Sequence, residues 1–229
     1  MAELVYATDL KSVGSNFVWV RVPSNAVYIK EMCMANIYFS QRSVIWSGLS
    51  NFTNCEFVDD GITYYNVESM FQAYKIPEEG KQERKQFEKI KPGYAKRLGR
   101  SVDLRKDWEH IKYKVMLKAL RLRFESDGSF RELLRQTGNN FLVEDTTSWH
   151  DNIWGACFCP RCREGWAGNK LGVAMMTIRS ENFPELKTIK FNYLGKEFET
   201  DELAIFVDDN GNTTKYNSIA CRNAPNLPT

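Results

Sequence analysis

The sequence lacks the marks of a membrane-spanning or secreted protein. No apolar run approaches the ~18 residues that a transmembrane helix needs. The N-terminal stretch MAELVYATDLKSV has an acid at its third position and no basic region before an apolar core, unlike a signal peptide. We therefore expect an intracellular, cytoplasmic protein with no membrane partner, in which the six cysteines are reduced.

A strong excess of charge of either sign is also lacking. The 31 basic and 29 acidic residues leave a net charge of +2, which does not by itself demand nucleic acid as a partner. There is no internal repeat and no low-complexity stretch. The chain has 229 residues, 43% of them hydrophobic and 26% charged. This is the composition of a soluble globular protein with one domain and additions, or with two small domains.

Hydrophobic patterns along the chain predict an α+β fold, mainly helical with short strands. A β hairpin is expected over 16–32, a short strand over 35–40, a tight turn at Asp60-Gly61 and a strand over 140–145. Helices are expected over residues 67–76, 79–89, 92–99, 102–126, 128–138 and 169–181. Asn66 is the expected N-cap of the first helix, without a capping box.

After residue 184 the pattern changes to strands joined by Gly and Asn turns, with Asn210-Gly211 as a hairpin turn. We interpret this tail as a β appendage. The predicted organisation is an N-terminal β extension over 1–34, a central domain over 35–182 and the C-terminal β appendage over 183–229.

The first candidate site is a polar stripe on an otherwise apolar segment, YYNVESMFQAYK (64–75). On a helix, Glu68, Gln72 and Lys75 point the same way, with Phe71 beside them. Charges on a helix are commonly a solvated ion pair. The apolar surroundings favour burial instead, and buried charges are retained when they are paired or used.

A second cluster occupies LVEDTTSWHDNIWG (142–155), where acids lie among tryptophans. This combination suits a pocket that binds a flat ring or a sugar and performs acid–base chemistry. The alternative is a loop with polar caps. The polar candidates and their aromatic neighbours are Glu144, Asp145, His150, Asp151, Trp149 and Trp154.

Three cysteines in CFCPRC, namely Cys157, Cys159 and Cys162, offer soft metal ligands. A fourth ligand would complete a tetrahedral zinc site, and His150 or a distant cysteine is the nearest candidate. The alternative is a group of reduced thiols in a loop.

A fourth candidate is the Gly-rich loop GWAGNKLG (165–172), which leads into a helix. Such a loop can bind phosphate through backbone N–H groups, with Asn169 as the helix cap and Lys170 as a phosphate partner. An ordinary loop and helix start explains the same residues.

The order of these motifs resembles the NADAR superfamily, also called YbiA-like N-glycosidases. The likeness covers about residues 35–180. It rests on SGLSNF (47–52), YYNVESMFQAYK, AKRLGR (95–100), the RKDW-containing helix 104–124, LVEDT, DNIWG (151–155) and GNKLGVAMMTIR (168–179). The resemblance implies an α+β fold, hydrolysis of an N-glycosidic bond at a ribose carbon, and no metal requirement.

Site residues follow from the resemblance position by position. Glu68 and Lys75 match the helix motif, Trp108 matches R-K-x-W, and Glu144 and Asp151 match the acids of the later motifs. Further candidates for substrate binding are Asn51, Phe52, Gln72, Arg100, Trp154, Asn169 and Lys170. Where the family commonly has a short Gly and Asp run, this chain has ACFCPRCREGWA, which suggests a changed pocket rim.

The resemblance leaves three functions open. The favoured one removes ADP-ribose from guanine of nucleic acid, with Glu68 as acid or base, Asp151 orienting the sugar and Lys75 either binding phosphate or forming a Schiff base. The alternatives are cleavage of small phosphoribosylamino-pyrimidine intermediates of riboflavin synthesis, and a non-catalytic module that binds ADP-ribose. Such a module would use Arg100, Arg105, Lys106 and Lys170 on phosphates.

Overall fold

A parallel pair of short strands joins distant parts of the chain in the middle of the fold. The computed structural model describes residues 19–21, 27–29, 36–208 and 210–222. Strand β3 (Ile37–Phe39) pairs with β6 (Leu142–Glu144) in register, Ile37 opposite Leu142 and Phe39 opposite Glu144. Helix α5 (Lys170–Asn182), in which nine of 13 residues are buried, packs against β6. The fold is α+β, as the sequence predicts.

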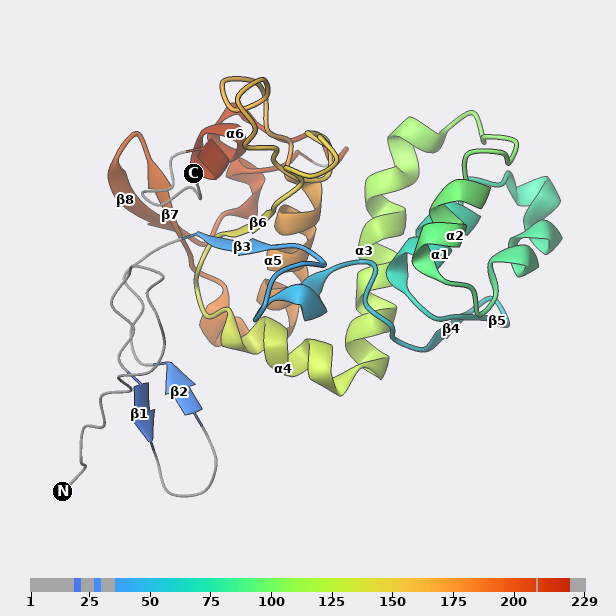
Figure 1. Ribbon diagram of the computed structural model, residues 1–229, viewed down its shortest axis with the longest axis horizontal. Helices are drawn as coiled ribbons and strands as arrows, with labels where there is room; N and C mark the ends of the chain where they lie inside the picture. Colours follow the sequence, from blue (N-terminus) through green and yellow to red (C-terminus); the bar gives the residue numbers. More distant parts are fainter. Residues whose placement is uncertain (1–18, 22–26, 30–35, 209, 223–229) are drawn as a thin grey trace.

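Helix α3 (Trp108–Ser126) stands between this layer and a second group of elements, packing on α5 and on α1 (Figure 1). The second group contains α1 (Val67–Ala73), α2 (Pro92–Leu98) and the hairpin of β4 (Phe57–Asp59) and β5 (Ile62–Tyr64). Helix α4 (Gly128–Gln136) follows α3. The 3-10 segments are η1 (Ser47–Leu49), η2 (Glu78–Phe87), η3 (Pro184–Leu186) and η4 (Leu203–Ile205).

The long helix packs one side on the core, where Trp108, Val115 and Ala119 are buried. The predicted start at residue 102 is wrong. The backbone N–H of Arg105 donates to the Lys75 carbonyl, 2.9 Å away, so the chain there is tied to the end of α1 and does not coil. Leu104, which lies before the helix, is 56% exposed.

Helix α1 begins as predicted and ends early. The Asn66 side chain accepts from the Ser69 backbone N–H at 2.8 Å, which confirms the N-cap. The helix ends at Ala73, and Lys75 lies on the turn that follows. The segment predicted as a helix over 79–89 consists instead of 3-10 turns within Glu78–Phe87, interrupted by non-helical backbone at Gly80.

The C-terminal segment is not made of strands alone. It forms the antiparallel hairpin β7 (Ile189–Tyr193) and β8 (Lys196–Thr200), and then helix α6 (Lys215–Arg222). Its apolar residues Ile189, Phe206 and Cys221 are fully buried in the common core. The segment therefore packs as part of the main body, and the boundaries at 34 and 182 stay predictions.

The predicted turns are present where they can be described. Gly211 has a φ of 76°, and the bridge between Val207 and Thr213 closes the turn at Asn210-Gly211. In the N-terminal part, β1 (Trp19–Arg21) pairs antiparallel with β2 (Val27–Ile29), as the hairpin prediction requires. None of the helices in the described ranges has the length and apolar character needed to cross a membrane.

We predict that Asn66→Ala lowers the free energy of unfolding by about 1–2 kcal/mol, because it removes the cap of α1. It also removes the hydrogen bond from Asn66 Nδ2 to the Ile90 carbonyl at 2.9 Å. Urea unfolding measures the change. Asn54→Ala, at an exposed position, is the control and should stay within about 0.5 kcal/mol of the wild type. Equal effects of the two substitutions would contradict the role of the cap.

Candidate active site

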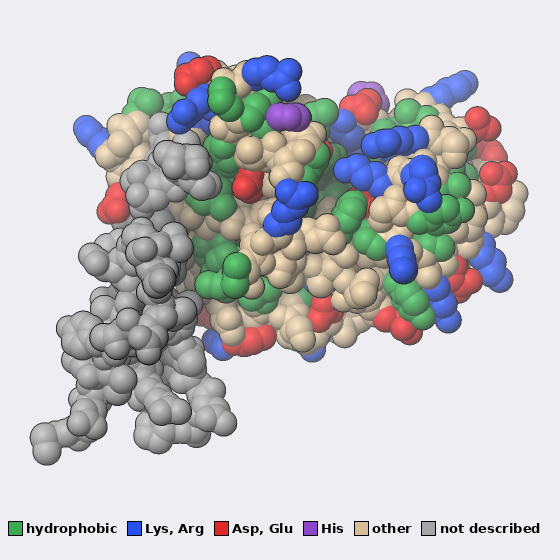
Figure 2. Space-filling view, viewed as in Figure 1, with side chains coloured by type: hydrophobic (Ala, Val, Ile, Leu, Met, Phe, Trp, Pro, Cys, Tyr) green, Lys and Arg blue, Asp and Glu red, His purple; other side chains and the backbone are tan. Residues whose placement is uncertain are grey.

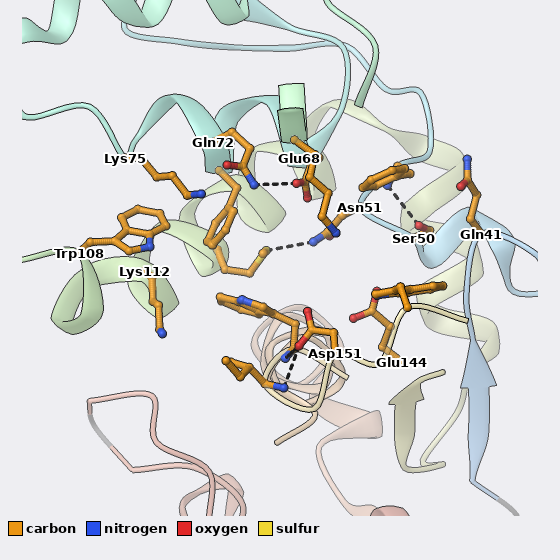
Figure 3. Close-up of a pocket in the computed structure, with 17 residues that line it drawn as sticks. Gln41, Ser50, Asn51, Glu68, Gln72, Lys75, Trp108, Lys112, Glu144 and Asp151 are labelled. Carbon is orange, nitrogen blue, oxygen red and sulfur yellow. Dashed lines mark hydrogen bonds between the residues drawn. The ribbon is translucent and has the colours of Figure 1, made fainter. Parts of the chain in front are cut away.

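A cavity of about 450 Å³ lies between α1 and the loop that follows β6 (Figure 3). This is an ordinary size for a small-molecule site. Its wall is a mixture of acids, lysines and aromatic rings. The lining residues are Gln41, Ser50, Asn51, Phe52, Glu68, Phe71, Gln72, Lys75, Lys96, Trp108, Lys112, Met116, Glu144, Trp149, Asp151, Ile153 and Trp154.

One wall comes from α1, whose seven residues are all buried. Glu68 is only 7% exposed, and its Oε1 accepts from Gln72 Nε2 at 2.8 Å. Lys75 Nζ donates to the Gly99 carbonyl at 3.1 Å. The polar stripe predicted from the sequence is therefore a buried feature of the cavity wall, and the interpretation as a solvated ion pair is wrong.

The facing wall comes from the end of β6 and the loop beyond it. Glu144 and Asp151 reach the cavity from this side, across from Glu68 (Figure 3). Asp151 Oδ1 accepts from the backbone N–H groups of Ile153 at 2.8 Å and Trp154 at 3.0 Å, which fixes the turn. Two of the three acids of the second sequence cluster thus meet the helix acid in one space, whereas Asp145 does not line the cavity.

Burial shifts the pKa of three groups in this cavity. The pKa of Glu68 is raised, mainly because burial penalises the carboxylate, although Gln72 and two lysines partly oppose this. Burial, together with Asp151 and Glu68, raises the pKa of Glu144 to about 8. The pKa of the Lys75 ammonium is lowered, mainly by burial. Acids with raised pKa values and an amine with a lowered one are suited to proton transfer.

Aromatic rings form the apolar part of the wall. Phe71 packs between Trp108 and Trp154, with its ring centroid 5.0 Å from each. Its ring and that of Trp154 are nearly perpendicular, at 81°. These contacts join α1, α3 and the loop after β6, so Phe71 connects the two walls. Trp149, at the cavity edge, is 41% exposed.

Two cavity lysines were missed in the sequence. Lys96 belongs to α2 and Lys112 to α3. Lys112 is one helical turn after Trp108, a spacing that could have placed it on the same face. Figure 2 shows lysine and arginine side chains gathered over the part of the molecule built from α1 and α2. The cavity therefore combines acids with a basic border.

Three predicted site residues lie outside this lining. Arg100 is exposed beyond the cavity. Lys170 is 9% exposed and lines an adjoining cavity of about 300 Å³ with Lys112. Asn169 occupies the N-cap position of α5 but makes no side-chain cap bond. Phosphate binding at this helix start stays a prediction.

Asn169 instead supports the facing wall from behind. Its Oδ1 accepts from the Glu144 backbone N–H at 3.0 Å, and its Nδ2 donates to the Leu142 carbonyl at 2.8 Å. To do so it adopts a left-handed backbone, with φ of 47°. Asn169 thus positions Glu144 and does not itself reach the cavity.

Two lining residues, Asn51 and Gln72, each hold a buried side-chain oxygen without a hydrogen-bond partner among the described residues. Asn51 Oδ1 has no hydrogen-bond partner, although most buried polar atoms in proteins have one. Its Nδ2 makes only a 3.5 Å contact with the sulfur of Met116. A bound molecule with a donor group at this point would satisfy Asn51.

The cysteine cluster lies next to the facing wall. His150 and the three cysteines place their ligand atoms within 4.8 Å of one another, a set compatible with a metal ion. None of the four residues lines the cavity.

Known proteins match most of the chain. A family profile described as the NADAR domain matches residues 37–181. The N-glycosidase YbiA of Escherichia coli (strain K12) is 36% identical over 148 residues, spanning 63% of this chain and 87% of that protein. The chloroplastic riboflavin biosynthesis protein PYRR of Zea mays is 32% identical over 161 residues, spanning 63% of this chain and 25% of that protein. The NMR structure of E. coli YbiA aligns with a TM-score of 0.56 at 35% identity, covering 66% of this chain and 86% of that one.

The raised pKa of Glu144 generates a prediction about stability. At a pH below 4.5, the ordinary pKa of the group, Glu144 is protonated in both the folded and the unfolded state. Its burial then costs no free energy for keeping the carboxyl neutral. As the pH rises toward about 8, only the unfolded state releases the proton, and stability falls by about 1.4 kcal/mol per pH unit. Glu144→Gln should therefore stabilise the protein at about pH 9 and have little effect at about pH 4.

Thermal and urea unfolding across this pH range measure the effect. Glu56→Gln, at an exposed position, is the control and should not change the pH dependence. A Glu144→Gln variant whose stability follows the wild type at every pH would show that the carboxyl is not held in its neutral form.

The close fit of Gln72 against α2 generates another prediction. A methyl group at Gly99, the C-cap of α2, would lie 2.0 Å from Gln72 Oε1, whereas one at Gly93, within α2, would meet nothing within 4 Å. We expect Gly99→Ala to cost about 1–3 kcal/mol of stability by displacing Gln72. Gly93→Ala should be neutral or stabilising by up to about 1 kcal/mol. Urea unfolding separates the two, and equal stabilities would disprove the contact.

Proposed function

This chain belongs to the NADAR domain family, and we propose that it removes ADP-ribose from guanine in nucleic acid. Its relatives in E. coli and in Nostoc punctiforme are named N-glycosidases. The chain is accordingly a hydrolase that acts on N-glycosyl compounds. The guanine substrate and the roles assigned below are the proposed part.

The observation that carries the proposal is the meeting of opposed acids around one cavity. Cleavage of an N-glycosidic bond develops positive charge on the ribose and negative charge on the departing nitrogen. A carboxylate stabilises the first, and an acid protonates the second. Glu68 on one wall and Glu144 and Asp151 on the other supply both kinds of group.

In the proposed reaction the bond between ribose C1 and the base nitrogen breaks, and its electron pair stays on the nitrogen. Glu68, whose raised pKa allows it to hold a proton, gives that proton to the nitrogen. Water adds its hydroxyl to C1 and returns its other proton to the Glu68 carboxylate. The net change is addition of one water across the bond. Glu144 and Asp151 bind the sugar hydroxyls.

Lys75 provides a covalent variant of this route. With the ribose ring open, its neutral Nζ attacks C1, and one proton of the amine passes through Glu68 to the base nitrogen. The base departs with the electron pair of the C1–N bond, and water hydrolyses the remaining imine to regenerate the amine. The lowered pKa of Lys75 increases the neutral fraction that this attack needs. Its turn position, held by Gly99, directs Nζ along the same wall as Glu68.

Support for the nucleic-acid substrate comes from the lysines that border the cavity and from the exposed tryptophan at its edge. Lys96 and Lys112 border the cavity besides Lys75, and two cations suit the two phosphates of ADP-ribose better than a single phosphate. The half-exposed ring of Trp149 offers a stacking surface for a base outside the cavity.

A second candidate substrate is a phosphoribosylamino-pyrimidine. Its support is the likeness to proteins named for riboflavin biosynthesis, in Zea mays and Arabidopsis thaliana.

The non-catalytic module is less well supported, because phosphate binding alone gains nothing from a buried carboxyl such as Glu68. Arg105, which that module would use, is already paired with Asp107 at 2.7 Å.

The test incubates the protein with an ADP-ribosylated guanine oligonucleotide and, separately, with phosphoribosylamino-pyrimidine, and identifies products by mass spectrometry. Release of ADP-ribose from the oligonucleotide, with slower cleavage of the small molecule, is the expected result. The reverse preference would identify the second candidate. Binding without cleavage of either would overturn the enzymatic proposal.

We predict that Glu68→Gln lowers the turnover by about 10²–10⁴-fold while the protein stays folded. Glu83→Gln, an exposed acid outside the cavity, is the control and should keep full activity.

Borohydride added during turnover should fix the sugar to Lys75, and Lys75→Met should abolish the adduct. Full turnover without any adduct would leave only the water route.

A further inference from the structure

We propose that His150, Cys157, Cys159 and Cys162 bind one zinc ion in a closed structural site that shapes the wall of the cavity. The four side chains converge at one point beside the loop after β6. The proposal does not depend on which substrate the cavity accepts.

The distances between the side chains fit a tetrahedral zinc site. His150 Nδ1 lies 3.2 Å from the sulfur of Cys157, 3.4 Å from that of Cys159 and 4.0 Å from that of Cys162. Zinc bonds of about 2.3 Å to sulfur and about 2.0–2.1 Å to nitrogen place tetrahedral ligands about 3.6–3.8 Å apart. The cluster is therefore already close to the required size. Three thiolates and one imidazole form a usual set for structural zinc.

The backbone around the cysteines brings two of the ligands together. Residues 159–162, CPRC, form a tight turn in which the Cys162 N–H donates to the Cys159 carbonyl at 2.9 Å. A turn with this C-x-x-C spacing is a usual source of two zinc ligands.

The backbone at His150 is also arranged for a ligand. Its φ of 59° lies in the left-handed region, which is unfavourable for a residue with a side chain. Two hydrogen bonds hold its neighbourhood, since the N–H groups of Trp149 and His150 both donate to the Thr146 carbonyl. Strain of this type is retained where a function requires it, and turning the ring toward the sulfurs is such a function.

A second layer of contacts fixes the cluster to the body of the protein. Asn152 Oδ1 accepts from the Cys157 backbone N–H at 2.9 Å. Arg222, at the end of α6, donates to the same oxygen at 3.3 Å and also to the Cys157 carbonyl. Its guanidinium lies over the ring of Phe158, 5.4 Å from the centroid. Partners of this kind orient metal ligands in known sites.

The role of the metal is structural and not catalytic. Four protein ligands leave no open position for water or substrate, whereas catalytic zinc keeps one. The ligands at 150 and 157 enclose Asp151, Ile153 and Trp154, which do line the cavity. Closing this loop on zinc fixes the wall that faces Glu68.

The first experiment measures zinc in the full-length protein, purified without chelator from cells grown with added zinc, by plasma mass spectrometry. One zinc ion per chain is expected. Cobalt(II) exchanged into the protein should give the absorption of tetrahedral cobalt bound to thiolates. Protein that contains almost no zinc and binds no cobalt, or that carries a disulfide within 157–162, would overturn the proposal.

The second experiment compares matched variants. His150→Ala and Cys159→Ser should lower the zinc content at least about tenfold. His110→Ala, the other histidine of the chain, and Cys55→Ser should leave it unchanged. Full zinc content in His150→Ala and Cys159→Ser would overturn the ligand assignment. Because the readout is metal content, the result is independent of whether the glycosidase proposal holds.

Discussion

The site depends on keeping the carboxyl group of Glu68 away from bulk water. A seven-residue helix with no exposed face holds it, and the amide of Gln72 is its hydrogen-bond partner. Gln72 in turn has room only because α2 presents Gly99, with no side chain, at that point. In water the same acid would be ionised at neutral pH and could not donate a proton. The packing of α1 against α2 and α3 thus sets the chemistry.

The facing wall of the cavity lowers the stability of the fold, because it also keeps a carboxyl group away from water. Burial, together with two nearby acids, raises the pKa of Glu144 to about 8. A polar residue of similar size without a charge would be easier to bury. Asn169 adopts a left-handed backbone in order to hold the strand that carries Glu144. Strain and buried charge of this kind gather where a protein has a function to perform.

The loop between β6 and α5 is long and carries much of the wall, yet it has little regular structure. Its order comes from separate local anchors: the Asp151 turn, the contacts of Arg222 from α6, and the proposed zinc site. The C-terminal segment therefore takes part in shaping the cavity from a distance.

The sequence by itself determined the α+β class, the N-cap at Asn66, the polar stripe of Glu68 and Gln72, and the acids after β6, because these depend on residue type and local spacing. Tertiary structure decided that Lys75 lies on a turn, that the long helix begins at Trp108, and that Lys96 and Lys112 join the cavity. Such outcomes come from contacts between distant segments, such as the bond from Arg105 to Lys75. Hydrophobic periodicity reports burial along one element, but it does not report which elements meet.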